Sequence, residues 1–236
     1  MKKRFVAPTA LMVLAASNIV APGWADELKI DFESPIYHET GLNGQDSWND
    51  SSLIHTITTN GALAGKQSLQ IAQPPRPSAD ADYAKSGHEY AIRKVHTGAD
   101  VAQWSMLVKP TQAGQFHARF DAGNGASPNV AGVYLDTRPN VLRASDTSGE
   151  RIGNSGDIMV GDTYRLTVSF DYDAQKYTVK VEGVGNPTSI SATFPFTHAN
   201  LTQEQASAGA ILFRNVLLKD FDGTTLVDDI TLGPKP

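Results

Sequence analysis

Two segments alternate polar and apolar residues in a way that would gather chemically useful side chains on one surface. The first runs Gln115-Phe-His-Ala-Arg-Phe-Asp121. Because successive side chains of a strand point to opposite faces, its polar residues would share one face. They are Gln115, His117, Arg119 and Asp121. The second segment, Gly132-Val-Tyr-Leu-Asp-Thr-Arg138, would place its polar residues opposite Val133 and Leu135 in the same way; they are Tyr134, Asp136 and Arg138.

This mixture of side chains suits sugar recognition. Aromatic rings pack on the C–H faces of sugars, while Arg, Asp and Gln hydrogen-bond to hydroxyl groups in fixed positions. We therefore expect a ligand-binding face, composed of Gln115, His117, Arg119, Tyr134 and Asp136. The alternative is an ordinary solvated strand face that binds nothing.

Other catalytic chemistries find little support. The sequence contains no Gly-x-Ser-x-Gly, Ser-x-x-Lys or His-Glu-x-x-His motif and no phosphate-binding glycine loop. The absence of cysteine excludes disulfide frameworks, zinc–cysteine sites and cysteine nucleophiles. No Glu after residue 25 has an Asp two positions later, which disfavours a glucanase that would carry its acid and nucleophile on one strand face.

These side chains must be positioned by short strands, because apolar and polar residues alternate with a period of two along much of the chain. The clearest element is a hairpin, with strands over 164–170 and 176–182 and a loop over 171–175. Further strands are predicted over 28–32, 68–72, 104–108, 115–120, 132–135, 141–144, 211–218 and 226–232. Helical patterns are weak, and 202–208 would form one or two turns at most.

These elements favour an all-β fold, a two-sheet antiparallel β-sandwich of the jelly-roll type. The proline-rich stretch 73–87 is either a linker or a long surface loop. A linker would leave only about 47 residues before it, too few for a sandwich, so we favour the loop and a single domain over 26–236. Trp48, in a Gly-rich turn, is expected to close the sandwich edge, and Trp104 to lie in the core.

Several short motifs, in their order along the chain, carry a resemblance. They are Asp31-Phe-Glu-Ser-Pro-Ile-Tyr37, Gly41-Leu-Asn-Gly-Gln-Asp-Ser-Trp48, Gly65-Lys-Gln-Ser-Leu69, Gly161-Asp-Thr-Tyr164 and Leu226-Val-Asp-Asp-Ile-Thr-Leu232. The chain resembles secreted bacterial domains of the concanavalin-A-like and laminin-G-like jelly-roll type, and it is similar to jelly-roll carbohydrate-binding modules. This resemblance implies a concanavalin-A-like sandwich and a glycan partner.

The resemblance also implies a metal and an enzymatic alternative. In similar modules a structural calcium joins the first and last strands, and the matching residues here are Glu33 and Asp229. Jelly-roll polysaccharide lyases neutralise a uronate carboxylate with Arg or Gln and move protons with His or Tyr. Gln115, His117, Arg119 and Tyr134 supply these residue types, although the Arg-x-Glu-x-Arg signature of such lyases is absent.

The first 25 residues have the features of a cleaved signal peptide. Lys2, Lys3 and Arg4 precede a mostly apolar stretch, and small residues end it at Ala25. We expect export to the periplasm or beyond the cell, with no membrane insertion of the mature form, because no later segment is apolar enough to cross a bilayer.

Charge further limits the possible partners. The formal net charge is −5, and removal of three cations with the signal peptide makes it −8. This acidity argues against a general nucleic-acid binder. The favoured function is therefore non-catalytic, lectin-like carbohydrate binding. The alternatives are a polysaccharide lyase or glycoside hydrolase of the jelly-roll type, and a cell-surface structural or interaction protein.

Overall fold

Period-two alternation is clearest in a hairpin on one side of the eight-stranded sheet. In the computed structural model, β11 (Thr163–Asp171) pairs along its whole length with β12 (Lys176–Val184), from Thr163 opposite Val184 to Asp171 opposite Lys176. The alternate residues Tyr164, Leu166 and Val168 are fully buried. The residues between them are only partly buried, so the predicted hairpin is confirmed.

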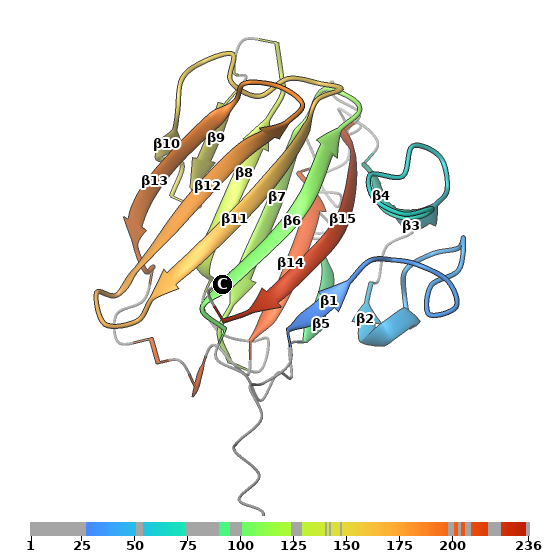
Figure 1. The fold of residues 1–236 in the computed structure, drawn as a ribbon, viewed down its shortest axis with the longest axis horizontal. Coiled ribbons are helices and arrows are strands. Elements are labelled where there is room, and N and C mark those ends of the chain that lie inside the picture. The colour runs from blue at the N-terminus through green and yellow to red at the C-terminus, as the bar shows by residue number, and fades with distance from the viewer. Residues whose placement is uncertain are drawn as a thin grey trace, which may run out of the picture.

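The structure describes residues 27–50, 54–73, 90–94, 101–123, 129–139, 141, 143–146, 148–197, 201–202, 204–205, 209–216 and 223–234. Within these ranges the strands form two antiparallel sheets, which Figure 1 shows one behind the other. The predicted two-sheet β-sandwich is therefore confirmed.

The front sheet in Figure 1 has eight strands, in the order β13-β12-β11-β6-β15-β4-β3, with β1 also pairing with β15. Besides the hairpin strands it contains β1 (Leu28–Ile30), β3 (His55–Thr58), β4 (Ser68–Gln73), β6 (Gln103–Pro110), β13 (Ser189–Pro195) and β15 (Gly223–Gly233).

The second sheet has seven strands, in the order β10-β9-β8-β7-β14-β5-β2. They are β2 (Trp48–Asn49), β5 (Ala91–Lys94), β7 (Gln115–Asp121), β8 (Asn129–Asp136), β9 (Arg143–Asp146), β10 (Arg151–Ile152) and β14 (Ala210–Asn215). A short 3-10 helix, η1 (Gln45–Ser47), precedes β2.

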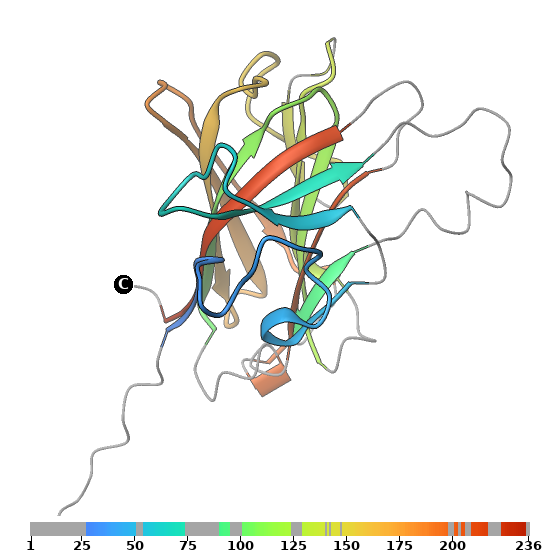
Figure 2. The same ribbon diagram turned by 90° about the vertical axis from the view of Figure 1, so that its right-hand side faces the viewer.

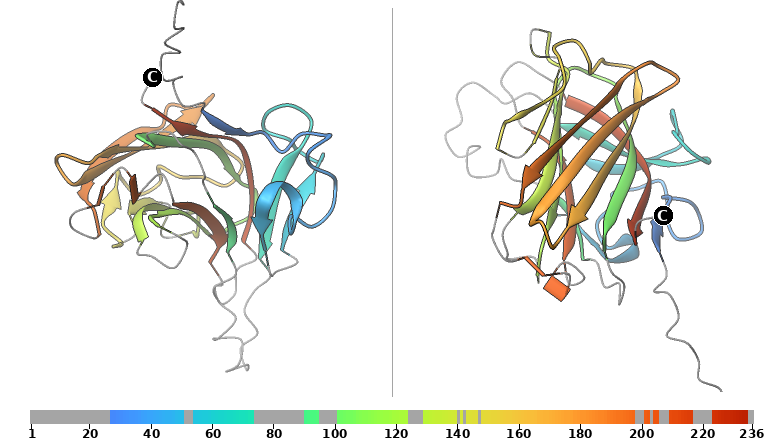
Figure 3. Two further views of the ribbon diagram at one scale, coloured as in Figure 1. Left: turned by 90° about the horizontal axis from the view of Figure 1, so that it is seen from below. Right: turned by 60° about the vertical axis from the view of Figure 1, so that its left-hand side comes forward.

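The two sheets pack face to face, as the view from below in Figure 3 and the turned view in Figure 2 show. Their inner faces form one apolar core, in which Trp104 is fully buried, as predicted. Trp48 is also buried and lies 5.0 Å from Phe213 and 6.2 Å from Phe32 between ring centroids, in keeping with its predicted place at the sandwich edge.

Some element boundaries differ from those predicted. The strand expected over 141–144 begins at Arg143 and ends at Asp146, and Val141 lies in a turn before it. Strands β3, β5 and β13 were not anticipated, because they are short or alternate small polar residues with few apolar ones. The predicted signal peptide, most of loop 73–87 and most of the segment 202–208 lie outside the described residues.

No helix within the described ranges is long and apolar enough to span a bilayer.

Candidate functional site

The polar face anticipated from the sequence is built by β7 and its two neighbours. Strand β7 lies between β14 and β8, with His117 opposite Arg214 on one side and opposite Tyr134 on the other. The alternate β7 residues Phe116, Ala118 and Phe120 belong to the core. The polar residues therefore project from the outer side of the seven-stranded sheet, which we call the polar face.

The ring of His117 lies between two tyrosine side chains at the centre of the polar face. The rings of His117 and Tyr134 are stacked, with centroids 3.9 Å apart and an interplanar angle of 14°. On the other side, Tyr90 Oη is 3.0 Å from His117 Nδ1 in a hydrogen bond whose donor depends on the histidine tautomer. Only 2% of His117 is exposed, so these contacts hold the imidazole in one orientation.

Two arginines flank this histidine. The guanidinium carbons of Arg119 and Arg214 lie 4.5 and 4.4 Å from the centroid of the Tyr90 ring, within cation–π distance. Arg119 Nη2 also donates a 2.7 Å hydrogen bond to Asp121 Oδ2. Among the described residues, the guanidinium groups of Arg119 and Arg214 and the carboxylate of Asp121 therefore lie around the tyrosine–histidine pair.

The surroundings shift the titration of the central groups. Burial, reinforced by the positive charges of Arg214 and Arg119, lowers the pKa of His117 well below its usual value. Burial raises the pKa of Tyr90, and the two arginines oppose that shift. His117 is therefore a neutral imidazole and Tyr90 a neutral phenol near neutral pH.

Gln115 and Asp136 belong to the same face but are engaged with each other. Gln115 Nε2 donates to Asp136 Oδ2 at 3.0 Å, and Arg138 Nε donates to Asp136 Oδ1 at 2.9 Å. Asp136 is only 1% exposed. The predicted residues thus lie on one face, but Asp136 orients Gln115 and Arg138 and is itself buried.

The polar face also carries buried polar atoms with unused hydrogen-bonding capacity. Within the described part of the chain, no hydrogen-bond partner is found for His117 Nε2, Arg119 Nε, Asp121 Oδ1 or Arg143 Nε. Buried polar atoms are nearly always hydrogen-bonded, so such a group requires a specific explanation. A polar ligand or ordered water at the polar face would satisfy these atoms.

Sequence reasoning missed Tyr90 and Arg214. Tyr90 immediately precedes the four-residue strand β5, which is too short for alternation to identify. Arg214 lies in a predicted strand, and it interrupts the apolar run 211–218 as a single charged residue. A single charged residue in an apolar run indicates that one side of the strand, here β14, faces a polar surface.

The two proposed calcium ligands are occupied by other partners. Glu33 Oε1 accepts hydrogen bonds from the backbone N–H groups of Lys66 and Gln67, at 2.6 and 2.9 Å. Asp229 Oδ2 accepts a 2.9 Å hydrogen bond from Arg165 Nη2. Arg165 neutralises the Asp229 carboxylate and two backbone N–H groups occupy Glu33 Oε1, so the donor set fits calcium poorly. Among the described residues, no three His, Cys, Asp or Glu side chains gather into a metal-binding group.

Comparisons with known proteins find likeness in structure alone. No family model matches the sequence, and no curated protein matches it. Among solved structures, lectin II from Ulex europaeus is 10% identical with a TM-score of 0.47, covering 88% of this chain and 97% of the lectin. Peanut lectin bound to a nonapeptide is 13% identical with a TM-score of 0.47, covering 89% and 100%.

A third similar structure is lectin I from Ulex europaeus with the methyl glycoside of α-L-fucose. It is 9% identical with a TM-score of 0.45, covering 89% of this chain and 99% of the lectin. At such values, functional inference must come from this chain's own side chains. The chain's own two sheets define it as an antiparallel β-sandwich with a tyrosine–histidine–arginine cluster on one outer face.

Proposed function

We propose that this protein binds an acidic carbohydrate on the polar face of its seven-stranded sheet. The observation that carries the proposal is the placement of Arg119 and Arg214 on Tyr90, beside the stacked pair of His117 and Tyr134. Guanidinium groups bind carboxylates with paired hydrogen bonds. Aromatic rings offer apolar faces to sugar C–H groups.

Local charge favours an acidic ligand despite the acidic composition. The sequence carries 25 Asp and Glu against 20 Lys and Arg. On the polar face, however, Asp121 and Asp136 are 1% exposed and each is held by an arginine. A local field of positive sign attracts anions even when the net charge of the protein is negative.

The binding proposal is tested by affinity electrophoresis in gels containing a uronate polymer or a neutral glucan. We expect retardation by the uronate polymer alone. Arg119→Gln should weaken retardation at least tenfold, because loss of a charge-assisted hydrogen bond costs about 1.5–3 kcal/mol. Lys180→Gln is the matched control, because this substitution removes one positive charge from β12, which lies in the other sheet.

Equal weakening by both variants would indicate unspecific attraction to a polyanion and would contradict a site on the polar face. Retardation by no glycan would instead favour the alternative of a structural or interaction protein.

A second candidate function, elimination of a uronate polymer, is favoured by the neutral imidazole of His117. In such a lyase, a base removes the proton next to the carboxylate, a C–C double bond forms, and the glycosidic C–O bond breaks. The leaving oxygen takes up a proton. The tyrosine hydroxyls of Tyr90 and Tyr134 and the His117 ring provide the proton-transfer groups, and the arginines would neutralise the carboxylate.

Incubation of the protein with uronate polymers tests this second function, because the unsaturated product absorbs in the near ultraviolet. Activity would be reduced at least 100-fold in His117→Gln, the loss expected when a general base is removed. A flat absorbance trace over several uronate polymers, from a protein that the same polymers retard, would leave binding without catalysis.

We also propose that the protein acts outside the cytoplasm, after cleavage behind Ala25. The cationic start and the apolar stretch behind it support this. Intact-mass measurement of the protein from the periplasmic and culture fractions of a bacterial host should give a chain beginning at Asp26. Recovery of the full 236-residue chain in the cytoplasm alone would contradict export.

A further inference from the structure

One row of outward-facing side chains crosses five strands of the seven-stranded sheet, from β14 through β7, β8 and β9 to β10 (Figure 1). Strand register sets its members opposite one another, and in order they are Arg214, His117, Tyr134, Ser145 and Arg151. The residues next to them in sequence belong to the core and include Phe213, Phe116, Leu135, Ala144 and Ile152. Because side chains alternate between the two faces of a sheet, the whole row lies on the polar face.

The β10 end of this row carries two arginines that lie outside the tyrosine–histidine–arginine cluster. Arg151 is exposed, and Arg143 is half-buried on the same side of β9 as Ser145. Since Arg151 pairs with Ser145, it is a diagonal neighbour of Arg143, with Cβ atoms about 7–8 Å apart. Arginine side chains are long enough for both guanidinium groups to meet one carboxylate at this spacing.

The acids of the polar face do not neutralise Arg143 and Arg151. The described carboxylates on the outer side of β7 and β8 are buried in ion pairs of their own, which are Asp121–Arg119 and Asp136–Arg138. Glu150 directly precedes Arg151, so alternation directs its side chain to the other side of β10. Within the described part of the chain, both arginines are therefore free to bind an anion.

The two groups of arginines are too far apart for a single sugar unit. The backbones of Arg214 and Arg151 are separated by four inter-strand spacings of about 4.8 Å, or about 19 Å in all. One sugar ring is shorter than this distance, whereas an oligosaccharide spans it. Between them lies the half-buried ring of Tyr134, whose register neighbour away from His117 is the small side chain of Ser145. The row therefore offers an aromatic surface between two charged ends.

We propose that the polar face binds the interior of an acidic polysaccharide chain that lies across the strands, with a second carboxylate subsite at Arg143 and Arg151. The first subsite is that of the proposed function, on which the second depends, and consists of Arg119 and Arg214 on Tyr90. One uronate unit meets the first subsite, a following unit packs on the tyrosine ring in the middle of the row, and a later uronate meets the second subsite. Paired guanidinium N–H groups suit a carboxylate at both places.

Isothermal titration calorimetry with a uronate disaccharide and a uronate hexasaccharide tests the second subsite. In the wild type the hexasaccharide should bind at least tenfold more tightly than the disaccharide, because only the longer ligand reaches both subsites. Arg151→Gln and Arg143→Gln should each reduce this ratio of affinities at least fivefold. Lys180→Gln, in the other sheet, is the matched control and should keep the wild-type ratio. Thermal melting of all three variants establishes that they are folded.

The outcomes distinguish failure of the second subsite from failure of the proposed function. Hexasaccharide binding that is weakened by Arg119→Gln but not by Arg143→Gln or Arg151→Gln would overturn the second subsite and leave the proposed function intact. Failure of the wild type to bind any uronate oligomer or polymer would overturn both.

NMR of the backbone amide groups tests the direction of the bound chain. The hexasaccharide, but not the disaccharide, should shift the amide signals of Ser145 and Arg151. A chain that runs along β7 would instead shift signals at both ends of that strand, Gln115 and Asp121, and leave those of β10 unmoved. This second pattern would overturn the proposed path across the strands.

Discussion

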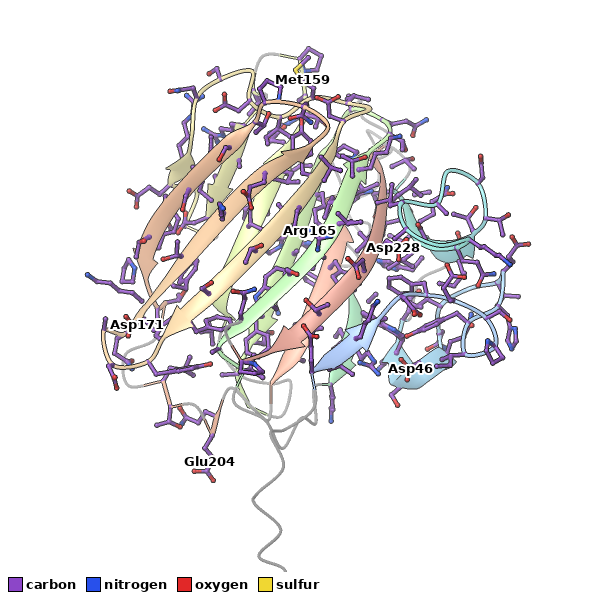
Figure 4. All side chains as sticks on the ribbon, viewed as in Figure 1. Asp46, Met159, Arg165, Asp171, Glu204 and Asp228 are labelled. Carbon is purple, nitrogen blue, oxygen red and sulfur yellow. The ribbon has the colours of Figure 1, made fainter. Side chains whose placement is uncertain are left out.

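Asp228 is a residue at which burial and charge conflict. It is fully buried in β15, beside a register shift in the pairing with β6. Its Oδ2 accepts hydrogen bonds from Ala64 N–H at 2.9 Å and Ser68 Oγ at 2.8 Å. Figure 4 labels it on the eight-stranded sheet. Burial outweighs these hydrogen bonds and raises the pKa of Asp228 to about 6.

The raised pKa of Asp228 predicts a pH-dependent loss of stability. The folded state holds this proton more tightly than the unfolded state, so its stabilising contribution is complete below pH 3.8 and declines as pH rises to about 6. The difference between the two pKa values corresponds to about 3 kcal/mol of folding free energy. Urea unfolding at several pH values should show this decline in the wild type relative to Asp228→Asn. Glu39→Gln, at an exposed position, is the control and should keep the wild-type slope.

His117 predicts the opposite slope in a different pH range. Its folded pKa is depressed, so the stability associated with neutral His117 is complete above pH 6.5 and is lost as pH falls below that value. In NMR spectra of the folded protein, the His117 ring signals should not shift between pH 8 and pH 6, whereas the same signals in urea should titrate near 6.5. A folded-state midpoint close to 6.5 would contradict the buried, neutral imidazole.

Hydrogen bonds of the Asn215 side chain join the two sheets. Asn215 lies in β14 of the seven-stranded sheet, and its Nδ2 donates to the carbonyl oxygens of Ile71 and Gly223 in the other sheet, at 2.7 and 2.8 Å. Its Oδ1 accepts a 2.9 Å hydrogen bond from Thr225 Oγ1. The side chain is 2% exposed, and all three hydrogen bonds cross the sandwich.

Asn215→Ala should therefore destabilise the fold by about 3 kcal/mol, because it leaves two carbonyls and a hydroxyl buried without these partners. Chemical unfolding with a linear extrapolation measures this loss. Asn49→Ala, on an exposed position of β2, serves as the control and should change stability by less than about 0.5 kcal/mol. A loss below about 1 kcal/mol in Asn215→Ala would mean that water or neighbouring groups replace these hydrogen bonds.

Period-two alternation predicted the elements where strands are long and one side is apolar. It identified β7, β8, β11 and β12, and it placed Gln115, His117, Arg119 and Tyr134 on one face. It could not identify β5, which has only four residues, or show that Tyr90 bonds to His117. That contact joins residues 27 positions apart, and their approach depends on β14 lying between β5 and β7. Strand order of this kind is set by packing of the whole core and leaves no local pattern.

The two outer surfaces of the β-sandwich differ in how their charged side chains are arranged. The eight-stranded sheet bears opposite charges that neutralise each other, as in the pairs Arg165–Asp229 and Lys180–Glu182. The seven-stranded sheet also pairs its acids with arginines, but these acids are buried, and the guanidinium groups of Arg119 and Arg214 lie on the ring of Tyr90. This asymmetry, rather than the net charge of −5, is what favours an acidic ligand.

The number of charges at the polar face also predicts how salt affects binding. Few arginine side chains of the polar face would contact the proposed ligand, and aromatic rings cover part of their guanidinium groups. Salt ions should therefore weaken uronate binding only moderately by screening. Between 50 and 300 mM NaCl we expect a decrease of about threefold to tenfold, measured by the same electrophoresis. A polymer held only by diffuse charge would be released completely, and this outcome would contradict a built site.

Ligand binding at the polar face is tested most directly by the affinity of the purified protein for a uronate polymer, compared between the wild type and Arg119→Gln. The proposed role of the polar face predicts binding in the wild type, at least tenfold weaker binding in Arg119→Gln, and wild-type binding in Lys180→Gln. Equal affinity in all three proteins, or binding of a neutral glucan in preference to the uronate polymer, would contradict it.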